Sequence, residues 1–449
     1  MARRYTISLV MIICFLLVYQ AGVMAQRYKE KEDKNEQNYG NTPDEIFPFS
    51  RFQEPYIRHF IYPMQPYLGP GREKPEPTDL EEVRIGFLGP MEGSNIIEYG
   101  TQMRQGAEMA LEEANARGGY KGLPYKLMLH NDVGLWGAAA NEVVKMDDEG
   151  VWAFLGTIDD INTHVALRVA LKVEICMMNT GDPDPTLTET NIPWLLRVIS
   201  DDRQSSYALA TYMYQEKGLK RAAVLRANNR YGRVGTGEFK ATSERMGYPV
   251  LLELRFSDGE TDFRGQLENI KKSTADAIVL WGNPKELALI IKQMKELGME
   301  HPVFACDRLV DPKFIEYAGE ENIEGIIATK QYKPDMSYPK YRDFHNAYVK
   351  RFNMEPDVFA AHAYDGMNII IQSIEIGGLN RAKIRDVMLD NKTFQGYEGV
   401  TGTMYFDASW NDIGEIYMVK IEDGEFVYFP RPEFKSDKAS SSTKEISDK

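Results

Sequence analysis

Residues 83–119 place a buried strand, a loop of short side chains and an amphipathic helix in direct succession, and this order restricts the possible folds most strongly. The apolar run at 83–88 suits a strand that is covered on both faces. Apolar residues then recur at helical spacing over 103–114, and Gly118-Gly119 marks the end of the helix. Open α/β sheets bind small molecules in the loops that follow such strands. We therefore expect ligand binding rather than catalysis.

Strands and helices alternate with short loops along most of the chain, which predicts parallel sheets with crossover helices. Further strands are expected at 152–155, 175–178, 221–225, 250–256, 277–280, 303–305 and 323–328, and helices at 162–172, 203–217, 235–246, 262–272, 284–297, 339–352, 358–376 and 381–391. The pattern then changes, and antiparallel strands are expected at 403–406, 416–421 and 426–429. Asp423 and Gly424 would form the hairpin turn between the last two strands.

Composition limits the possible functions. The 449 residues exceed what one core usually supports, so two lobes are expected. The net charge of −14 argues against a nucleic-acid partner, because phosphate binding requires a basic surface. Cys176 and Cys306 are expected to be buried free thiols in different lobes. No cysteine or histidine pair has metal-ligand spacing, and no nucleophile or phosphate-loop motif occurs. We expect no metal, no cofactor and no enzymatic activity.

The N-terminal segment 1–25 has the features of a signal peptide. Two arginines precede an apolar run at 7–19, and small residues offer a cleavage site after Ala25. An uncleaved anchor helix is the alternative, but the run falls short of the about 20 residues that span a bilayer. Cys14 lies inside the apolar run, so no lipid anchor is expected. These features predict a periplasmic or secreted protein.

Two segments differ in composition from the rest of the chain. Residues 26–82 combine a charged stretch with aromatic residues and prolines, which predicts a flexible N-terminal extension. Two interpretations stay open: this arm docks on the folded body or on a partner, or it is a loose tether. Residues 431–449 are polar and are expected to form a disordered tail.

Several segments in order carry a family pattern. They are IGFLGPMEG, EYG, GAEMALEEANARGG, AFLG, NTGDPDPTLT, LLRVISDD, RANNRYGRVGTGEFKATSERMG, DFRGQLENIKKSTADAIVLWGNPKELALIIKQMKELGM, AYDGMNIIIQSIE and GVTGTMYFD. None is specific alone, but in this order and spacing the chain resembles the type I periplasmic solute-binding proteins of ABC transporters. The similarity is to the leucine-binding-protein-like branch, which binds branched-chain amino acids and amides, and it covers about residues 83–430.

The resemblance implies an α/β fold of two Rossmann-like lobes with parallel sheets, joined by three hinge crossovers, with the ligand enclosed between them. The first lobe would comprise residues 83–202 and 333–402, and the second lobe residues 203–332 and 403–430. Closure on the ligand would be a hinge motion of the crossover segments.

The resemblance also implies a site in which first-lobe N–H groups and hydroxyls hold a carboxylate, and a second-lobe carboxylate holds an ammonium. Tyr99 would lie over the ligand, or would be a packing tyrosine. Tyr231 would be a cleft tyrosine of the second lobe, and Asn283 would reach the cleft from a second-lobe loop. Asp307 falls at the acidic position that receives the ammonium. The alternative for Asp307 is an intramolecular ion pair with Arg308 or Arg230.

The first lobe departs from the family pattern in two loops. The loop 156–160 ends with two aspartates, and the loop 179–183 carries an aspartate and a proline. The first-lobe candidates are Asp160, Asn179, Thr180 and Gly181. Added carboxylates and a proline, which lacks an N–H donor, make a poor seat for a free carboxylate. Either the ligand is an amide, an amine or a more cationic solute, or the aspartates only cap helices.

The leading functional prediction is an extracytoplasmic binding protein that delivers a small polar ligand to an ABC permease. The ligand would be amino acid-like, an amide or an amine. The alternative is a ligand-sensing or scaffold module that signals to a membrane partner through the same lobes. A hydrolase stays open only because catalytic triads cannot be read from chain order.

Overall fold

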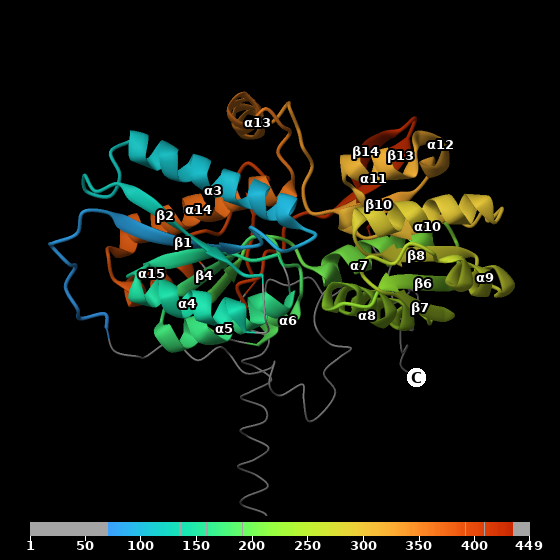
Figure 1. The fold of residues 1–449 in the computed structure, drawn as a ribbon, viewed down its shortest axis with the longest axis horizontal. Helices are drawn as coiled ribbons and strands as arrows, with labels where there is room; N and C mark the ends of the chain where they lie inside the picture. The colour runs from blue at the N-terminus through green and yellow to red at the C-terminus, as the bar shows by residue number, and fades with distance from the viewer. Residues whose placement is uncertain are drawn as a thin grey trace, which may run out of the picture.

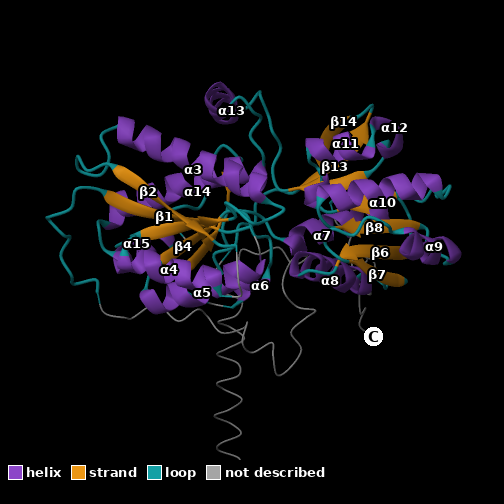
Figure 2. Ribbon diagram, viewed as in Figure 1, coloured by secondary structure: helices purple, strands orange, loops and turns teal. Residues whose placement is uncertain are grey.

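The computed structural model describes residues 71–133, 137–158, 160–190, 192–390, 392–407 and 409–433. The expected signal peptide, residues 26–70 of the extension and the tail from residue 434 lie outside the described residues. The described chain forms two lobes, each with a sheet between layers of helices (Figures 1 and 2). The predicted fold class, two α/β lobes with parallel sheets joined by three crossovers, is confirmed.

The first lobe is built on a parallel five-stranded sheet in the order β2-β1-β3-β4-β5. Its strands are β1 (Val83–Gly89), β2 (Tyr125–Asn131), β3 (Ala153–Gly156), β4 (Cys176–Asn179) and β5 (Leu195–Arg197). Its helices are α3 (Ile97–Ala116), α4 (Ala138–Asp148), α5 (Asp160–Val173), α6 (Thr186–Glu189), α13 (Pro339–Phe352), α14 (Val358–Gly377) and α15 (Arg381–Met388). The short strands β11 (Tyr397–Glu398) and β12 (Thr403–Met404) form a separate antiparallel pair. The strand and helix expected within 83–119 are confirmed as β1 and α3.

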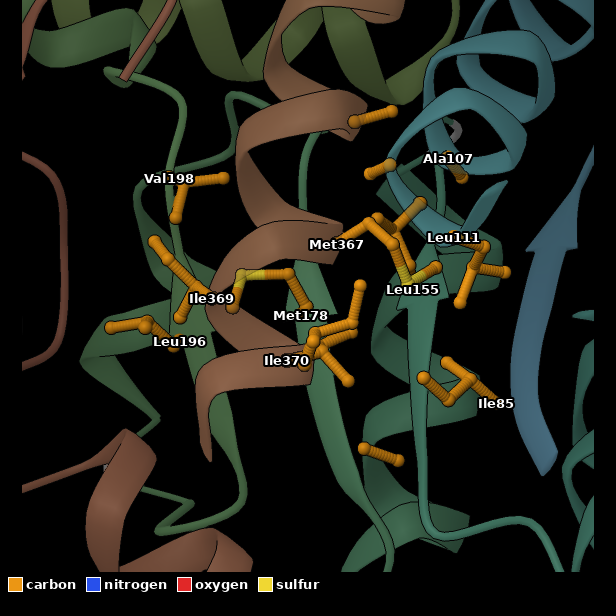
Figure 3. Close-up of a cluster of buried hydrophobic side chains, with 14 of the residues drawn as sticks. Ile85, Ala107, Leu111, Leu155, Met178, Leu196, Val198, Met367, Ile369 and Ile370 are labelled. Atoms are coloured by element: carbon orange, nitrogen blue, oxygen red, sulfur yellow. The ribbon is translucent and has the colours of Figure 1, made fainter. Parts of the chain in front are cut away.

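The core of the first lobe lies between its sheet and the helix pair α3 and α14. Figure 3 shows Ala107 and Leu111 of α3 and Met367 and Ile370 of α14 beside Leu155 and Met178 of the sheet. The two helices pack closely at Gly106, where an added Cβ would lie 2.0 Å from the carbonyl oxygen of Ala360. The rings of Tyr99 and Phe359, near the N-termini of these helices, therefore lie only 4.7 Å apart.

The second lobe is built on a seven-stranded sheet in the order β14-β13-β10-β9-β8-β6-β7. Its strands are β6 (Ala222–Ala227), β7 (Leu252–Phe256), β8 (Ala277–Trp281), β9 (Val303–Ala305), β10 (Ile327–Lys330), β13 (Tyr417–Glu422) and β14 (Glu425–Pro430). Its helices are α7 (Asp202–Thr211), with a π turn at Tyr212–Glu216, α8 (Arg230–Arg245), α9 (Arg264–Lys272), α10 (Pro284–Glu296), α11 (Pro312–Ala318) and α12 (Glu320–Ile323), and a 3₁₀ turn spans Asp307–Leu309. β13 and β14 pair antiparallel, and Asp423 (φ 51°) and Gly424 (φ 77°) form the predicted hairpin turn between them.

The chain passes between the lobes after β5, after β10 and before β13. The last passage comes later than the expected boundary at residue 402. Met404 and Trp410 still pack in the core of the first lobe, because that lobe covers their apolar side chains. Arg197 of β5 also pairs through its backbone with Asn411. The strand expected at 403–406 is β12, which pairs with β11 rather than with the final hairpin.

Two other elements differ from the sequence pattern. α8 begins at Arg230, ahead of the expected start at residue 235, because the Asn229 side chain accepts a hydrogen bond from the backbone N–H of Gly232 and caps the helix. The strand expected at 323–328 begins later, since α12 ends at Ile323 and β10 spans Ile327–Lys330. The sequence pattern had not indicated β2 or α4.

Residues 71–82, the described end of the expected flexible extension, lie against the first lobe. We call this segment the N-terminal strap. Arg72 forms an ion pair with Asp386 of α15, with Nε 2.5 Å from Oδ2. Glu76 accepts a hydrogen bond from the Tyr120 hydroxyl at 3.0 Å. These two contacts attach the strap to the first lobe.

Cys176 and Cys306 are buried free thiols in the cores of different lobes, as predicted. Among the helices of the described residues, none combines the length and the apolar character that a membrane crossing requires.

Candidate ligand-binding site

A cavity of about 540 Å³ lies between the lobes, at the N-terminal ends of α3 and α14. The first lobe contributes Tyr99 and Phe359 to its wall, and the second lobe contributes Asp307 and Lys330. A neighbouring cavity of about 240 Å³ shares Tyr99 and reaches Asn283. The larger volume falls within the about 300–1,000 Å³ of typical small-molecule sites. A solute in this cavity would contact both lobes.

Asp307 begins the 3₁₀ turn, with one residue between it and the end of β9, so it lies at the carboxyl end of a strand. The residue is only 4% exposed. The hydroxyl of Tyr231, in the first turn of α8, donates a hydrogen bond to Oδ1 of Asp307 at 2.6 Å. Within the described residues, Asp307 forms no ion pair. The Tyr231 hydroxyl thus orients a buried anion that no cation of these residues neutralises by direct contact.

The two arginines considered as partners of Asp307 lie elsewhere. Arg308 places its guanidinium over the Tyr231 ring, 3.7 Å from the centroid, and donates to Oδ1 of Asn283 at 2.9 Å. Arg230 pairs with Asp184 of the first lobe. Asn283 therefore contacts the site through Arg308, and neither arginine forms an ion pair with the Asp307 carboxylate.

Tyr99 connects the lobes at the cavity. Its hydroxyl donates a hydrogen bond to Oδ2 of Asp311, in the second lobe, at 2.9 Å. Beside it, Glu98 forms an ion pair with Lys313 across the same boundary. The Tyr99 ring also contacts Phe359, so these two rings form an aromatic wall of the cavity.

The first-lobe candidates lie away from the two cavities. Asn179 ends β4, and the side-chain oxygens of Asn179 and Thr180 are buried without a hydrogen-bond partner among the described residues. Gly181 packs tightly, since an added Cβ would lie 2.6 Å from Cε of Met103. Asp160 begins α5, and its side chain lies outside what the structure describes. The structure thus brings together Tyr99, Asp307 and, through Asp307, Tyr231, but no described residue of the first-lobe loops 156–160 and 179–183 lines the cavity wall.

Several charged residues of the cavity wall were not anticipated from the sequence, among them Asp311, Lys330 and Asp357. Asp311 caps α11 and Asp357 caps α14. Their sequence signal, an aspartate just before a helix, is that of a structural N-cap, so it does not reveal a position in a cleft. Lys330 had no signal beyond its place at the end of a strand.

Acidic residues outnumber basic residues in the cavity wall. Burial raises the pKa of the Asp357 carboxyl to about 7, although the backbone N–H of Ala360 and the charge of Lys330 act in the opposite direction. Burial and, after it, the negative charge of Asp307 raise the pKa of the Tyr231 hydroxyl well above its usual value. Negative charge in a partly desolvated cavity favours a cationic ligand group. Among the described residues, no three His, Cys, Asp or Glu side chains are placed to hold a metal ion.

Two buried arginine interactions also connect the lobes on the side of α8. Arg203 of α7 forms ion pairs with Glu189 of the first lobe and with Glu238 of α8, the latter at 3.0 Å. Arg230 forms its ion pair with Asp184 at 2.5 Å. The described lobes are therefore in direct contact on both sides of the site.

The model of the periplasmic binding proteins matches residues 82–425 of this chain. The chain belongs to the periplasmic binding protein family. This binding protein is 24% identical over 361 residues to Leu/Ile/Val-binding protein homolog 2 of Brucella abortus, which covers 79% of this chain and 95% of that protein. It is also 24% identical to the leucine-, isoleucine-, valine-, threonine- and alanine-binding protein of Pseudomonas aeruginosa, covering 73% of this chain and 86% of that protein.

Solved structures agree with this assignment. The leucine-binding protein LivK of Thermotoga maritima matches with a TM-score of 0.70 at 25% identity, covering 77% of this chain and 97% of that chain. A solute-binding protein of Rhodopseudomonas palustris in complex with benzoate matches with a TM-score of 0.69 at 18% identity, covering 78% of this chain and 96% of that chain. At that lower identity the likeness shows the fold alone. This binding protein is therefore an extracytoplasmic solute-binding protein for small molecules, of the family that works with ABC transporter permeases.

Proposed function

We propose that this protein captures a small amino acid-like solute, such as an amino acid, an amino amide or an amine, in the interlobe cavity and delivers it to an ABC permease. The observation that carries the proposal is Asp307, a residue of the cavity wall that is 4% exposed and whose carboxylate accepts a hydrogen bond from the Tyr231 hydroxyl. Burial of a charged carboxylate is unfavourable unless the charge is both paired and hydrogen-bonded, and Tyr231 supplies the hydrogen bond but not the opposite charge. An ammonium group of the solute supplies that charge.

The other residues of the site have supporting roles in this proposal. Tyr99 and Phe359 cover the solute from the first lobe, and Tyr231 orients the Asp307 carboxylate. The buried oxygens of Asn179 and Thr180 have no partner among the described residues, but both residues lie away from the cavity, so the proposal gives them no contact with the solute. The names of the curated relatives describe proteins that bind leucine, isoleucine or valine, which agrees with an amino acid-like solute.

We further propose that residues 1–25 act as a cleaved export signal without a lipid anchor. The support is the basic and apolar pattern of this segment, together with the extracytoplasmic location of the family. The partner of the solute-loaded protein is then the membrane permease of an ABC transporter.

The test is a thermal-shift screen of the mature chain with amino acids, amino amides and amines, followed by calorimetric titration of each compound that raises the Tm. Asp307→Asn should weaken binding of a cationic solute by at least about tenfold, because a buried interaction with a charged group contributes about 1.5–3 kcal/mol. The isosteric amide keeps an acceptor for the Tyr231 hydroxyl, so the variant separates charge from packing.

The matched control is Asp262→Asn on the second lobe, where the aspartate side chain is 68% exposed and pairs with Arg264 at the surface. This variant should bind as the unmodified protein does. The proposal fails if no compound of the panel binds, or if Asp307→Asn retains full affinity for a cationic solute.

A further inference from the structure

Lys330 is a buried lysine that ends β10 and lines the interlobe cavity. The residue is only 7% exposed. Its Nζ donates to two backbone carbonyl oxygens, that of Asp307 at 3.3 Å and that of Val310 at 3.1 Å. Within the described residues, no carboxylate forms an ion pair with it. A lysine ammonium has three donors, so these two contacts leave one donor for another acceptor.

The direct contacts of the Lys330 ammonium are to neutral oxygens, and Asp357, whose carboxyl its charge influences, makes no ion pair with it. Burial of a charge is unfavourable unless the charge is paired and hydrogen-bonded, and two carbonyl groups supply only the hydrogen bonds. The nearby acids have other partners: Asp307 accepts from Tyr231, and Asp357 caps α14 through the backbone N–H of Ala360. The cavity beside Lys330 is therefore a favourable position for an anionic group of a ligand.

The contact between Lys330 and the backbone of Asp307 places the two charged residues side by side. Nζ of Lys330 lies one hydrogen bond from the Asp307 carbonyl, and both residues belong to the wall of the same cavity. A cationic and an anionic binding group in adjacent positions complement a ligand that carries both charges close together. An α-amino acid is such a ligand.

We propose that Lys330 binds the carboxylate of a zwitterionic amino acid whose ammonium is held by Asp307. This inference rests on the proposed function and extends it, because it assigns both charged ends of the solute to the second lobe. The loop 179–183 of the first lobe does not line the cavity, and Pro183 within it has no N–H to donate. The first lobe instead supplies apolar surface through Tyr99 and Phe359, which suits an apolar amino-acid side chain.

The test compares pairs of compounds that differ only in the carboxylate: L-leucine with 3-methylbutylamine and with L-leucinamide, and L-phenylalanine with 2-phenylethylamine. Isothermal titration calorimetry of the mature chain measures each affinity. The unmodified protein should bind the amino acid of a pair at least tenfold more tightly than its amine or amide. Lys330→Met should remove this preference. The affinity for the amino acid should fall at least tenfold, while the affinity for the amine should stay within about twofold.

Two further variants keep the result interpretable. Lys330→Arg retains a cation and should recover part of the preference for the carboxylate. Lys333→Met, at an exposed lysine of the same segment, should bind all compounds as the unmodified protein does. If Lys330→Met does not fold, the comparison of amino acid, amide and amine in the unmodified protein decides alone.

Equal affinity of the unmodified protein for the amino acid and its amine overturns the assignment of Lys330. An equal loss of affinity for the amino acid and for the amine in a folded Lys330→Met variant also overturns it, because the lysine would then only support the shape of the cavity. Both results leave the proposed function intact, since binding still occurs and still requires Asp307. Absence of binding for every compound overturns the proposed function and the Lys330 assignment together.

Discussion

The guanidinium of Arg230, at the start of α8 in the second lobe, donates to Oδ2 of Asp184 in the first lobe from Nε at 2.8 Å and from Nη2 at 2.5 Å. The Asp184 side chain is fully buried, whereas that of Arg230 is 29% exposed. Burial opposes ionisation, but the interaction with His164 and the charge of Arg230 outweigh it and hold the pKa of Asp184 well below its usual value. The carboxylate therefore stays charged at every pH above its ordinary value of 3.8, and its ion pair with Arg230 connects the lobes.

Arg230→Gln should loosen this connection and shift the protein toward more open lobes. We expect a larger radius of gyration in small-angle X-ray scattering of the solute-free protein. Loss of the Arg230–Asp184 ion pair should cost about 1 kcal/mol, a value reduced because the arginine is partly exposed. This loss corresponds to about fivefold weaker solute binding. Arg233→Gln, at an exposed position one turn along α8, is the control and should change neither quantity. An unchanged radius of gyration in Arg230→Gln would show that the pair does not set the lobe angle.

Tyr231→Phe should weaken binding of a cationic solute about tenfold, because the hydroxyl that orients the Asp307 carboxylate is lost. Tyr214→Phe is a matched control in the same lobe. The Tyr214 hydroxyl donates to Oγ of Ser243 at 3.0 Å within the core, so its removal should lower the unfolding free energy by about 1 kcal/mol and leave the affinity unchanged. Calorimetric titration and denaturant unfolding separate the two effects. Equal affinities of both variants would contradict the orienting role of Tyr231.

The stability of the protein should decline as the pH rises from 5 to 8. Burial raises the pKa of Asp412, which lies beside the last crossover, to about 7, against an ordinary value of 3.8. Between these values the folded state binds the proton more tightly than the unfolded state, so the unfolding free energy falls with increasing pH. Asp412→Asn should flatten this dependence and raise the Tm at pH 8 by a few degrees. The pKa of Asp357 is raised as well, so part of the pH dependence of stability should remain in the Asp412→Asn variant. If the stability of Asp412→Asn depended on pH as steeply as that of the unmodified protein, Asp412 would not be a source of the dependence.

Gly106→Ala should strongly destabilise the first lobe. The added methyl would meet the backbone of Ala360 on α14, and such overpacking costs about 1–3 kcal/mol or more. Gly265→Ala is the reference substitution, since that helical glycine has open space around its Cα and an exposed position. It should be neutral or raise the unfolding free energy by up to about 1 kcal/mol. Denaturant unfolding measures both, and a neutral Gly106→Ala would show that α3 and α14 can separate without loss.

The parts of the fold that could be predicted have local signals. The β1 and α3 unit and the turn at Asp423-Gly424 are encoded in contiguous residues. β2 was missed because it is an edge strand whose residues are only partly buried, with Leu129 43% exposed, so no continuous apolar run marks it. The position of the last crossover was expected too early in the chain. Trp410 packs in the core of the first lobe against residues distant in sequence, and no local pattern indicates such packing.

The candidate site divides in the same way. Asp307, Tyr231 and Tyr99 could be proposed from the family pattern, and the structure places all three at or beside the cavity. Lys330 and Asp357 could not be, because their proximity depends on how the two lobes meet rather than on any local motif. The hydrogen bond between Tyr99 and Asp311 is likewise a product of the lobe arrangement.

The N-terminal strap has a consequence for how motion of this protein would be observed. Arg72 and Glu76 attach the strap to the first lobe, through Asp386 and Tyr120. A fluorophore attached within the strap itself, at residues 71–82, therefore shares the frame of reference of that lobe. In such an arrangement the second lobe becomes the moving part. A distance probe between the strap and the β13–β14 hairpin would therefore report solute-driven closure directly, without a correction for independent movement of the attachment point.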